Sequence, residues 1–200
     1  MKKILFAVIT LSILSFSYAP GTYGVDKSAS IIHWYGKKTT GEHYGDIKLQ
    51  SGTLNFQTGV PTAGEFVIDM TTISVSDIKD PGDNKDLVDH LKKDDFFGVS
   101  NFPTAKIVIK KFEPLKKGEV DNANYRATAD LTIKGITNQI QFPAQIDITG
   151  ADVKAAAKIT IDRTKWKIVY KSKTIFSSLG DKFIYDDVTF NVNLVLHASK

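Results

Sequence analysis

The sequence predicts an all-β protein in which about eight antiparallel strands close into a barrel, with one short helix over one end. The main observation is alternation: from Val188 to Leu196 every second residue is apolar, and mostly polar residues fill the gaps. This period of two is typical of a strand with one buried and one solvent-exposed face. The pattern recurs along most of the chain, without a βαβ unit, tandem repeat or linker. Closing such a sheet removes the edges that the strands would otherwise expose.

Residues 1–19 are predicted to be a signal peptide and not part of the barrel. A basic start precedes an apolar run from Ile4 to Phe16, which is too short to span a bilayer comfortably. Ser17 and Ala19 are small residues of the kind that a signal peptidase reads. A permanent N-terminal anchor is the alternative. We expect residues 20–200 to form one domain, periplasmic or secreted, with no permanent membrane span.

Charge and cysteine content exclude several classes of protein. The chain has 26 basic and 22 acidic residues, and Lys2 and Lys3 would leave with the leader. A domain so nearly balanced gives no electrostatic reason to expect a nucleic-acid partner. The absence of cysteine removes disulfides, thiolate metal sites and thiol catalysis.

Most of the expected strands show this alternation, whereas the strand at 31–36 has apolar residues on both faces and is expected to be covered on both. In chain order the expected strands are 22–26, 31–36, 47–56, 66–70, 105–109, 127–133, 140–148, 155–161 and 188–196. Gly41 and Gly45 are predicted to flank a turn. Gly52 is predicted to form a bulge or a bend. Pro143 has no N–H to donate, so it must fall at a bulge or where the ladder needs no donor.

One helix is predicted between these strands. Asp83 is expected to cap it, and its apolar stripe consists of Leu87, Val88 and Leu91. Four bulky apolar residues follow within residues 96–102, so this loop is expected to pack against the mouth of the barrel.

The inward apolar face is the main candidate binding site. Its predicted ligand-binding residues are Phe66, Ile68, Met70, Leu131, Phe142, Ile159, Ile161, Phe190, Val192 and Leu194. Small residues on the same face would leave room between them: Ala127, Ala129, Ala144, Ala155 and Ala157. An eight-stranded barrel is just wide enough either to be filled by side chains or to hold one small ligand. Both alternatives therefore stay open at this stage.

The histidines and paired acids offer weaker candidates. A satisfied core histidine is the first interpretation of His33, but His33 and His43 are also candidates to approach each other and contact a polar headgroup. No histidine pair has the helical spacing of a metal site. Turn chemistry is the preferred interpretation of the pairs at 94–95 and 186–187, because adjacent carboxylates on a strand face opposite ways. The basic cluster at 163–173 is predicted to be a solvated face, with an anionic headgroup or membrane surface as the alternative.

Four segments together resemble the YceI-like family. They are SASIIHWYGKKTTGEHYG, LKKDDFFGVSNFPTAKI, LTIKGITNQIQFPA and ITIDRTKWKIVYKS, in the order found in that family and within residues 22–197. The resemblance implies a lipocalin-like barrel, exported to the periplasm or beyond, that binds a long amphiphile such as a polyisoprenoid or a fatty amide. It carries over no catalytic residue.

We therefore expect non-catalytic binding or carriage of a lipid-like small molecule in the barrel interior. No enzyme activity, cofactor or metal is expected. The alternative is a structural or stress-related envelope module with a filled core. The oligomeric state stays open, and a homodimer is one alternative to a monomer.

Overall fold

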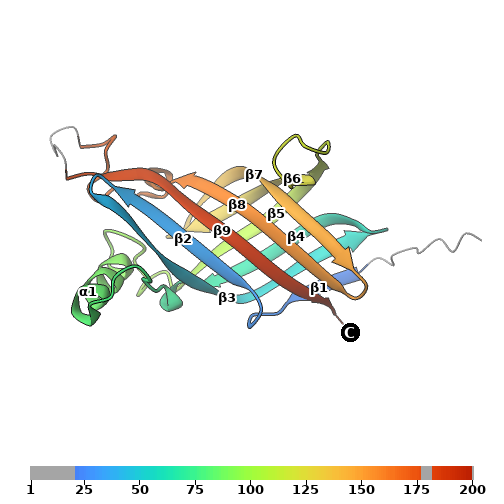
Figure 1. The fold of residues 1–200 in the computed structure, drawn as a ribbon, viewed down its shortest axis with the longest axis horizontal. Helices are drawn as coiled ribbons and strands as arrows, with labels where there is room; N and C mark the ends of the chain where they lie inside the picture. The colour runs from blue at the N-terminus through green and yellow to red at the C-terminus, as the bar shows by residue number, and fades with distance from the viewer. Residues whose placement is uncertain (1–20, 177–181, 200) are drawn as a thin grey trace, which may run out of the picture.

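The computed structural model describes residues 21–176 and 182–199, and the predicted signal peptide lies outside them. Within the described residues the chain forms nine strands, one α-helix and two short 3-10 helices (Figure 1). The strands are β1 (Gly21–Val25), β2 (Ile31–Lys38), β3 (Gly41–Gln57), β4 (Val60–Asp69), β5 (Thr104–Pro114), β6 (Tyr125–Ile133), β7 (Ile136–Thr149), β8 (Asp152–Asp162) and β9 (Ile184–Ala198). The helices are η1 (Met70–Thr72), α1 (Pro81–Lys92) and η2 (Arg163–Trp166).

The strands form a closed antiparallel barrel, as predicted. Eight strands pair in the order β3-β2-β9-β8-β7-β6-β5-β4, and the pairing of β3 with β4 closes the ring. The ninth strand, β1, pairs with β3 and β9 just as β2 does, but farther along both strands. β1 and β2 therefore occupy successive stretches of one position in the barrel wall.

Alternation places the core inside the ring. On β6, Ala127, Ala129, Leu131 and Ile133 are buried, and the residues between them are only partly buried. The same period holds along β4 and β5. One apolar face of each strand thus supplies the hydrophobic interior, and the other face meets solvent.

The glycines of β3 serve close packing, and the turn predicted at 41–45 is wrong. These residues lie within β3, and the chain turns at residues 39–40 instead. A Cβ on Gly45 would lie 1.8 Å from the Ser74 carbonyl oxygen, so only glycine fits there. At Gly52 a Cβ would lie 2.1 Å from a ring carbon of Phe66. The predicted irregularity is nearby, as a register shift between Leu49 and Ser51.

Helix α1 lies at one end of the barrel, near the turn between β2 and β3 (Figure 1). Its N-cap is Asp80, not the predicted Asp83. The Asp80 carboxylate accepts hydrogen bonds from the backbone N–H groups of Gly82 and Asp83, at 2.9 and 3.0 Å. Pro81 is the first helical residue, where its fixed φ and missing N–H are tolerated. No helix among the described residues is long and apolar enough to cross a membrane.

The ladder between β7 and β8 stops partway along both strands. Pairing ends at Ala144 and Ala157, although β7 begins at Ile136 and β8 continues to Asp162. Pro143 is the next residue of β7: it still pairs with Arg126 of β6, but on the other side it lies where the β7–β8 ladder needs no donor. Beyond this gap the Trp166 ring N–H donates to the Leu131 carbonyl at 3.1 Å and connects η2 to β6.

Candidate functional site

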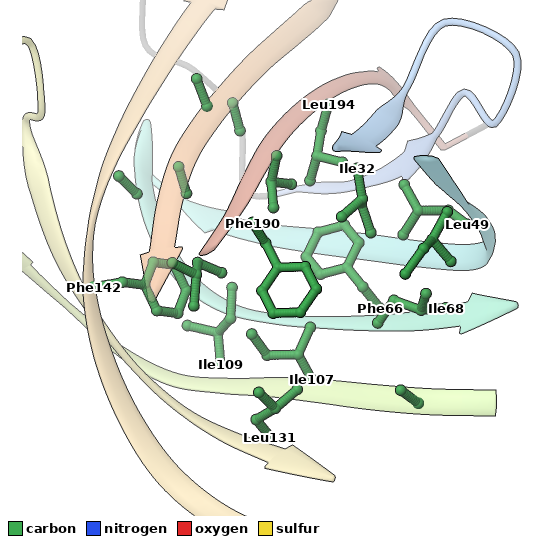
Figure 2. A pocket seen from close by; sticks show the side chains of 18 of the residues that line it. Ile32, Leu49, Phe66, Ile68, Ile107, Ile109, Leu131, Phe142, Phe190 and Leu194 are labelled. Atoms are coloured by element: carbon green, nitrogen blue, oxygen red, sulfur yellow. The ribbon is translucent and has the colours of Figure 1, made fainter. Parts of the chain in front are cut away.

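An apolar cavity of about 130 Å³ lies inside the barrel. A single buried water needs only about 10–15 Å³, so the interior is not filled by its own side chains. Figure 2 shows the labelled side chains pointing into this space from several strands. The lining residues are all apolar: Ile32, Ile47, Leu49, Leu54, Phe66, Ile68, Met70, Phe97, Ala105, Ile107, Ile109, Phe112, Leu131, Ile133, Phe142, Ala144, Ile146, Ala155, Ala156, Ala157, Ile159, Phe190, Val192 and Leu194. We call this space the inner cavity.

Small side chains on β8 help to keep the inner cavity open. Ala155 and Ala157 line it, and their partners on β9 are Leu194 and Val192. If side chains filled the barrel, all four residues would be buried. Ala155, Ala157 and Val192 are only partly buried, which indicates open space beside them. The predicted contribution of Ala127 and Ala129 is absent, because both are fully buried and do not line the cavity. The room therefore comes from β8 and Ala144 of β7, not from β6.

A second cavity of about 90 Å³, the outer cavity, lies between the barrel and α1. Leu87 and Leu91 of α1 line it, together with Phe96 of the following loop. The loop therefore packs against the mouth of the barrel, as predicted. Phe97 and Phe190 line both cavities. The two spaces are therefore adjacent and are separated only by side chains.

The outer cavity differs from the inner one in having polar side chains in its lining. These are Lys37, Lys38, His43 and Arg163. Only the apolar parts of these side chains face the space, so the surface of the outer cavity is as apolar as that of the inner one. Among the described residues, no three His, Asp or Glu side chains lie together as metal ligands would.

His43 is held by a partly buried carboxylate. Its Nδ1 lies 2.7 Å from Asp77 Oδ2, and the backbone N–H of Tyr44 donates to Asp77 Oδ1 at 2.9 Å. Burial acts to raise the pKa of Asp77, but these hydrogen bonds prevail and lower it below its usual value. An ionised carboxylate only accepts hydrogen bonds, so Nδ1 of His43 is the donor in this contact.

The predicted ligand-binding residues fall into three groups. Ile161 and His43 line the outer cavity, and His33 lines neither cavity. The other nine line the inner cavity: Phe66, Ile68, Met70, Leu131, Phe142, Ile159, Phe190, Val192 and Leu194. Their contact with a ligand stays a prediction.

His33 and His43 do not meet, so the expected approach between them is wrong. His33 is partly exposed on the outer face of β2, where its Nδ1 lies 2.5 Å from Asp46 Oδ1. His43 pairs with Gly36, three residues from His33, and faces the outer cavity. An odd spacing along a strand puts two side chains on opposite faces. His33 is therefore neither a core histidine nor part of this site.

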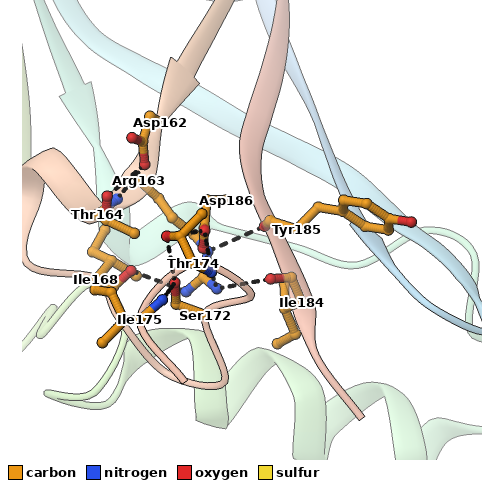
Figure 3. A network of polar contacts seen from close by, with 10 residues as sticks. All are labelled: Asp162, Arg163, Thr164, Ile168, Ser172, Thr174, Ile175, Ile184, Tyr185 and Asp186. Carbon is orange, nitrogen blue, oxygen red and sulfur yellow. Dashed lines mark hydrogen bonds and ion pairs between the residues drawn. The ribbon is translucent and has the colours of Figure 1, made fainter. Parts of the chain in front are cut away.

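Asp186 belongs to a buried polar network, so the predicted role of the 186–187 pair in a turn is wrong (Figure 3). The pair lies within β9, and Asp186 Oδ1 is 3.2 Å from Arg163 Nη2. The Arg163 guanidinium also donates to the backbone carbonyls of Ile168, Ile184 and Tyr185. Burial acts to raise the pKa of Asp186, but hydrogen bonds, chiefly from Thr174, hold that pKa below its usual value.

The predicted solvated face at 163–173 is therefore only partly correct. Arg163 and Trp166 are buried, whereas Lys165, Lys167 and Lys173 are exposed. The buried arginine ties the chain after η2 to the start of β9. It is a structural cation near the outer cavity, and the exposed lysines form the solvated part.

Several lining residues were missed by the sequence analysis. Ile107 and Ile109 follow the same alternation as the predicted set and could have been found by extending it to β5. Phe97 lies in a loop, where no period relates it to the barrel interior. Its position at both cavities depends on how the loop folds back, which the sequence pattern does not contain.

Comparison with known proteins identifies the same fold. The YceI-like domain family matches residues 23–196. The BcnA structure from Burkholderia cenocepacia is 20% identical with a TM-score of 0.67, covering 86% of this chain and 98% of that chain. A polyisoprenoid binding domain from Saccharophagus degradans is 14% identical with a TM-score of 0.58, covering 88% and 98%. The Campylobacter jejuni YCEI protein is 19% identical with a TM-score of 0.55, covering 100% and 94%. No curated protein matches the chain significantly.

Proposed function

This chain belongs to the YceI-like family, and from that membership and its apolar cavity we propose that it binds and carries a long-chain amphiphile. A polyisoprenoid or a fatty-acid derivative has the required chemistry, a long hydrocarbon with one polar end. The observation that carries the proposal is the inner cavity of about 130 Å³ with its wholly apolar lining. The similar domain from Saccharophagus degradans is described as polyisoprenoid binding, which supports the same ligand class.

Hydrocarbon burial supplies enough free energy for useful binding. The inner cavity of about 130 Å³ is close to the size that holds one benzene ring, so a longer tail fits only when the lining side chains move apart. Full burial of a tail of about ten carbons gains about 8 kcal/mol at roughly 0.8 kcal/mol per methylene, before the cost of that movement. Ordering the tail and immobilising the ligand reduce this gain, so micromolar affinity is expected for tails of this length or longer. Of the described residues that line the inner cavity, none is titratable or nucleophilic. A binding protein fits such a lining better than an enzyme does.

Extraction of the natively purified protein tests the proposal. Organic solvent should release one amphiphile in stoichiometric amount, detectable by mass spectrometry. The variant Ala157→Phe fills the cavity without adding a polar group, and we expect it to lose the amphiphile. Lys154→Phe is the matched control, because Lys154 is exposed on the same strand, and it should retain the amphiphile.

An envelope module without a ligand is the alternative function. It predicts that no amphiphile is extracted from the native protein and that added fatty acids or prenols do not bind. An empty extract alone can reflect loss during purification, so binding of added ligand decides between the two functions.

We also propose export to the periplasm or beyond. The basic start, short apolar run and small residues before position 20 support it. Cell fractionation should find the protein outside the cytoplasm, with an N-terminus beginning near residue 20. A full-length protein retained in the inner membrane would instead indicate a permanent anchor.

A further inference from the structure

Exposed apolar side chains gather near the start of β9. Five large apolar residues of the described chain are strongly exposed, and three of them are Ile175 at 50%, Phe176 at 44% and Tyr185 at 39%. They lie in residues 171–176 and 182–185, which we call the basic tip. Figure 1 places it at the end of the barrel where α1 lies. Large apolar groups that gather in an exposed segment mark interaction surfaces more often than single ones do.

The same segment is basic and contains few acids. Lys171, Lys173 and Lys182 lie in the tip, and Lys165 and Lys167 lie just before it. None of these five lysines makes an ion pair with another described residue. Between residues 163 and 185 the sequence has one acid, Asp181, which lies outside the described residues, against Arg163 and five lysines, although the whole chain is nearly balanced in charge. The positive charge is therefore concentrated here by position and not by overall composition.

The neighbouring β2–β3 turn adds to this charge. The backbone N–H of Thr39 donates to the Phe183 carbonyl at 3.4 Å, so the turn lies against the tip. Lys37 and Lys38 precede the turn, and Glu42 follows it as the nearest acid. Asp187 is exposed on β9 beyond the tip. Cations outnumber acids around the tip even when these neighbours are included.

The base of the tip is firmly anchored. Arg163 bonds to the carbonyls of Ile184 and Tyr185, and Lys173 N–H donates to the Ile184 carbonyl at 3.3 Å. The Lys173 ammonium also lies 5.2 Å from the centre of the Tyr185 ring. Figure 3 shows Ile175 and Tyr185 on opposite sides of this network. The exposed apolar groups thus lie on both sides of the network that anchors the tip.

We propose that the basic tip docks the protein onto an anionic phospholipid bilayer. Lysines at a membrane surface are attracted by anionic headgroups at about 1 kcal/mol each, and aromatic side chains favour the interfacial region. The three exposed apolar groups would enter that region while the lysines remain at the phosphates. Helix α1 carries three acids, Asp83, Asp86 and Asp89, against Lys85 and Lys92, so it adds no net positive charge at this end and the tip approaches an anionic surface first.

Docking here would bring the outer cavity to the lipid surface. Ile184 of the tip and Lys37 and Lys38 beside it line that cavity. A carrier would then exchange its cargo at the end that contacts the membrane. This consequence rests on the proposed function, but docking itself does not, because it needs only the outer surface of the tip.

Vesicle sedimentation tests the docking. Delipidated protein should sediment with vesicles of phosphatidylcholine and phosphatidylglycerol, but not with phosphatidylcholine alone, and salt should weaken the association. Replacing Lys171 and Lys173 with Gln should lower partitioning about thirtyfold, roughly fivefold for each charge. Replacing Ile175 and Phe176 with Ser should also lower partitioning. The melting temperature of the protein should not change, because both side chains are exposed.

Matched controls lie at the other end of the barrel. Val60 is 47% exposed, and Lys116 and Lys117 are exposed in the loop after β5. Val60→Ser and Lys116→Gln/Lys117→Gln should sediment like the unaltered protein. Equal binding to both vesicle types, unchanged binding of the tip variants, or binding to heparin without binding to vesicles would each overturn the proposal. None of these outcomes depends on whether the barrel binds a cargo.

Discussion

Phe97 and Phe190 lie between the inner and outer cavities, and both rings line both spaces. One comes from the loop after α1 and the other from β9, so the partition is built by segments far apart in sequence. Figure 2 shows the Phe190 ring among the side chains that line the inner cavity. A hydrocarbon tail can occupy both cavities only if these rings move.

The first prediction concerns the length of the bound chain. Phe190→Ala should join the two cavities, so affinity should keep rising with chain length beyond the point where the unaltered protein levels off. Displacement of a fluorescent fatty acid by fatty alcohols of increasing length measures this. Phe66→Ala is the control, because Phe66 lines only the inner cavity. If affinity levels off at the same chain length in Phe190→Ala and in the unaltered protein, Phe190 does not separate the two cavities.

The second prediction concerns the contact between Gly52 and Phe66. A methyl group at position 52 would lie 2.1 Å from the Phe66 ring, so Gly52→Ala should force the ring toward the cavity. We expect a loss of about 1–3 kcal/mol in the free energy of unfolding, as for other overpacked cores. Urea denaturation measures it.

Two variants control this experiment. Gly24→Ala should be nearly neutral, because its added Cβ meets only an ordinary contact at 3.7 Å. In the double variant Gly52→Ala/Phe66→Ala the two losses should be less than additive, because the clash is removed with the ring. Full additivity would mean that the ring is not the cause.

The third prediction concerns the ion pair between Arg163 and Asp186, whose side chains are almost completely buried. Asp186→Asn leaves the guanidinium without its counter-charge, and removing one partner of such a pair costs about 3–5 kcal/mol. Urea denaturation should reveal this loss. Arg163→Met/Asp186→Leu removes both charges and should cost much less. A double variant as unstable as Asp186→Asn would indicate that the hydrogen bonds of Arg163, not the uncompensated charge, dominate.

The fourth prediction concerns pH. Hydrogen bonds with Asp152 and Asp26 raise the pKa of His197, whereas hydrogen bonds from Ser28 lower that of Asp26 to about 2. A raised pKa in the folded state stabilises the protein below the unfolded value of about 6.5, and this stabilisation is lost as pH rises through the folded pKa. His197→Gln should therefore lower the melting temperature more in mildly acidic buffer than in alkaline buffer. The same difference at both pH values would contradict the charged pair.

Much of the fold follows from the sequence because one physical rule repeats. Alternating residues such as Ala105, Ile107 and Ile109 identify a strand and its buried face together, and closure was expected because it removes the exposed edges of such a sheet. The same rule identified Phe142 and Leu194 as inward-facing. It could not find Phe97, because residues in a loop have no period.

The wrong predictions have a common cause. Gly45 was interpreted as a turn residue, but it is required by the close approach of Ser74, which is distant in sequence. Asp186 was assigned to a turn, but its partner Arg163 lies on another segment. In each case the residue was correctly singled out. The reason for it is a contact with a residue distant in sequence, which no local pattern encodes.

The ladder between β7 and β8 ends at Ala144 and Ala157, so beyond these residues the barrel wall has no backbone pairing between the two strands. Along β6–β7 and β8–β9 the paired residues continue to the far end of the strands, so spreading either pair breaks backbone hydrogen bonds. Between residues 136–143 of β7 and 158–162 of β8 there are no paired residues to separate. Separating β7 from β8 in this stretch breaks no ladder hydrogen bond, and the Asn138 side chain, which donates to the Lys165 carbonyl at 3.0 Å, is the polar contact that crosses nearby. A bulky ligand can therefore widen the wall here while the other strand pairs keep their register.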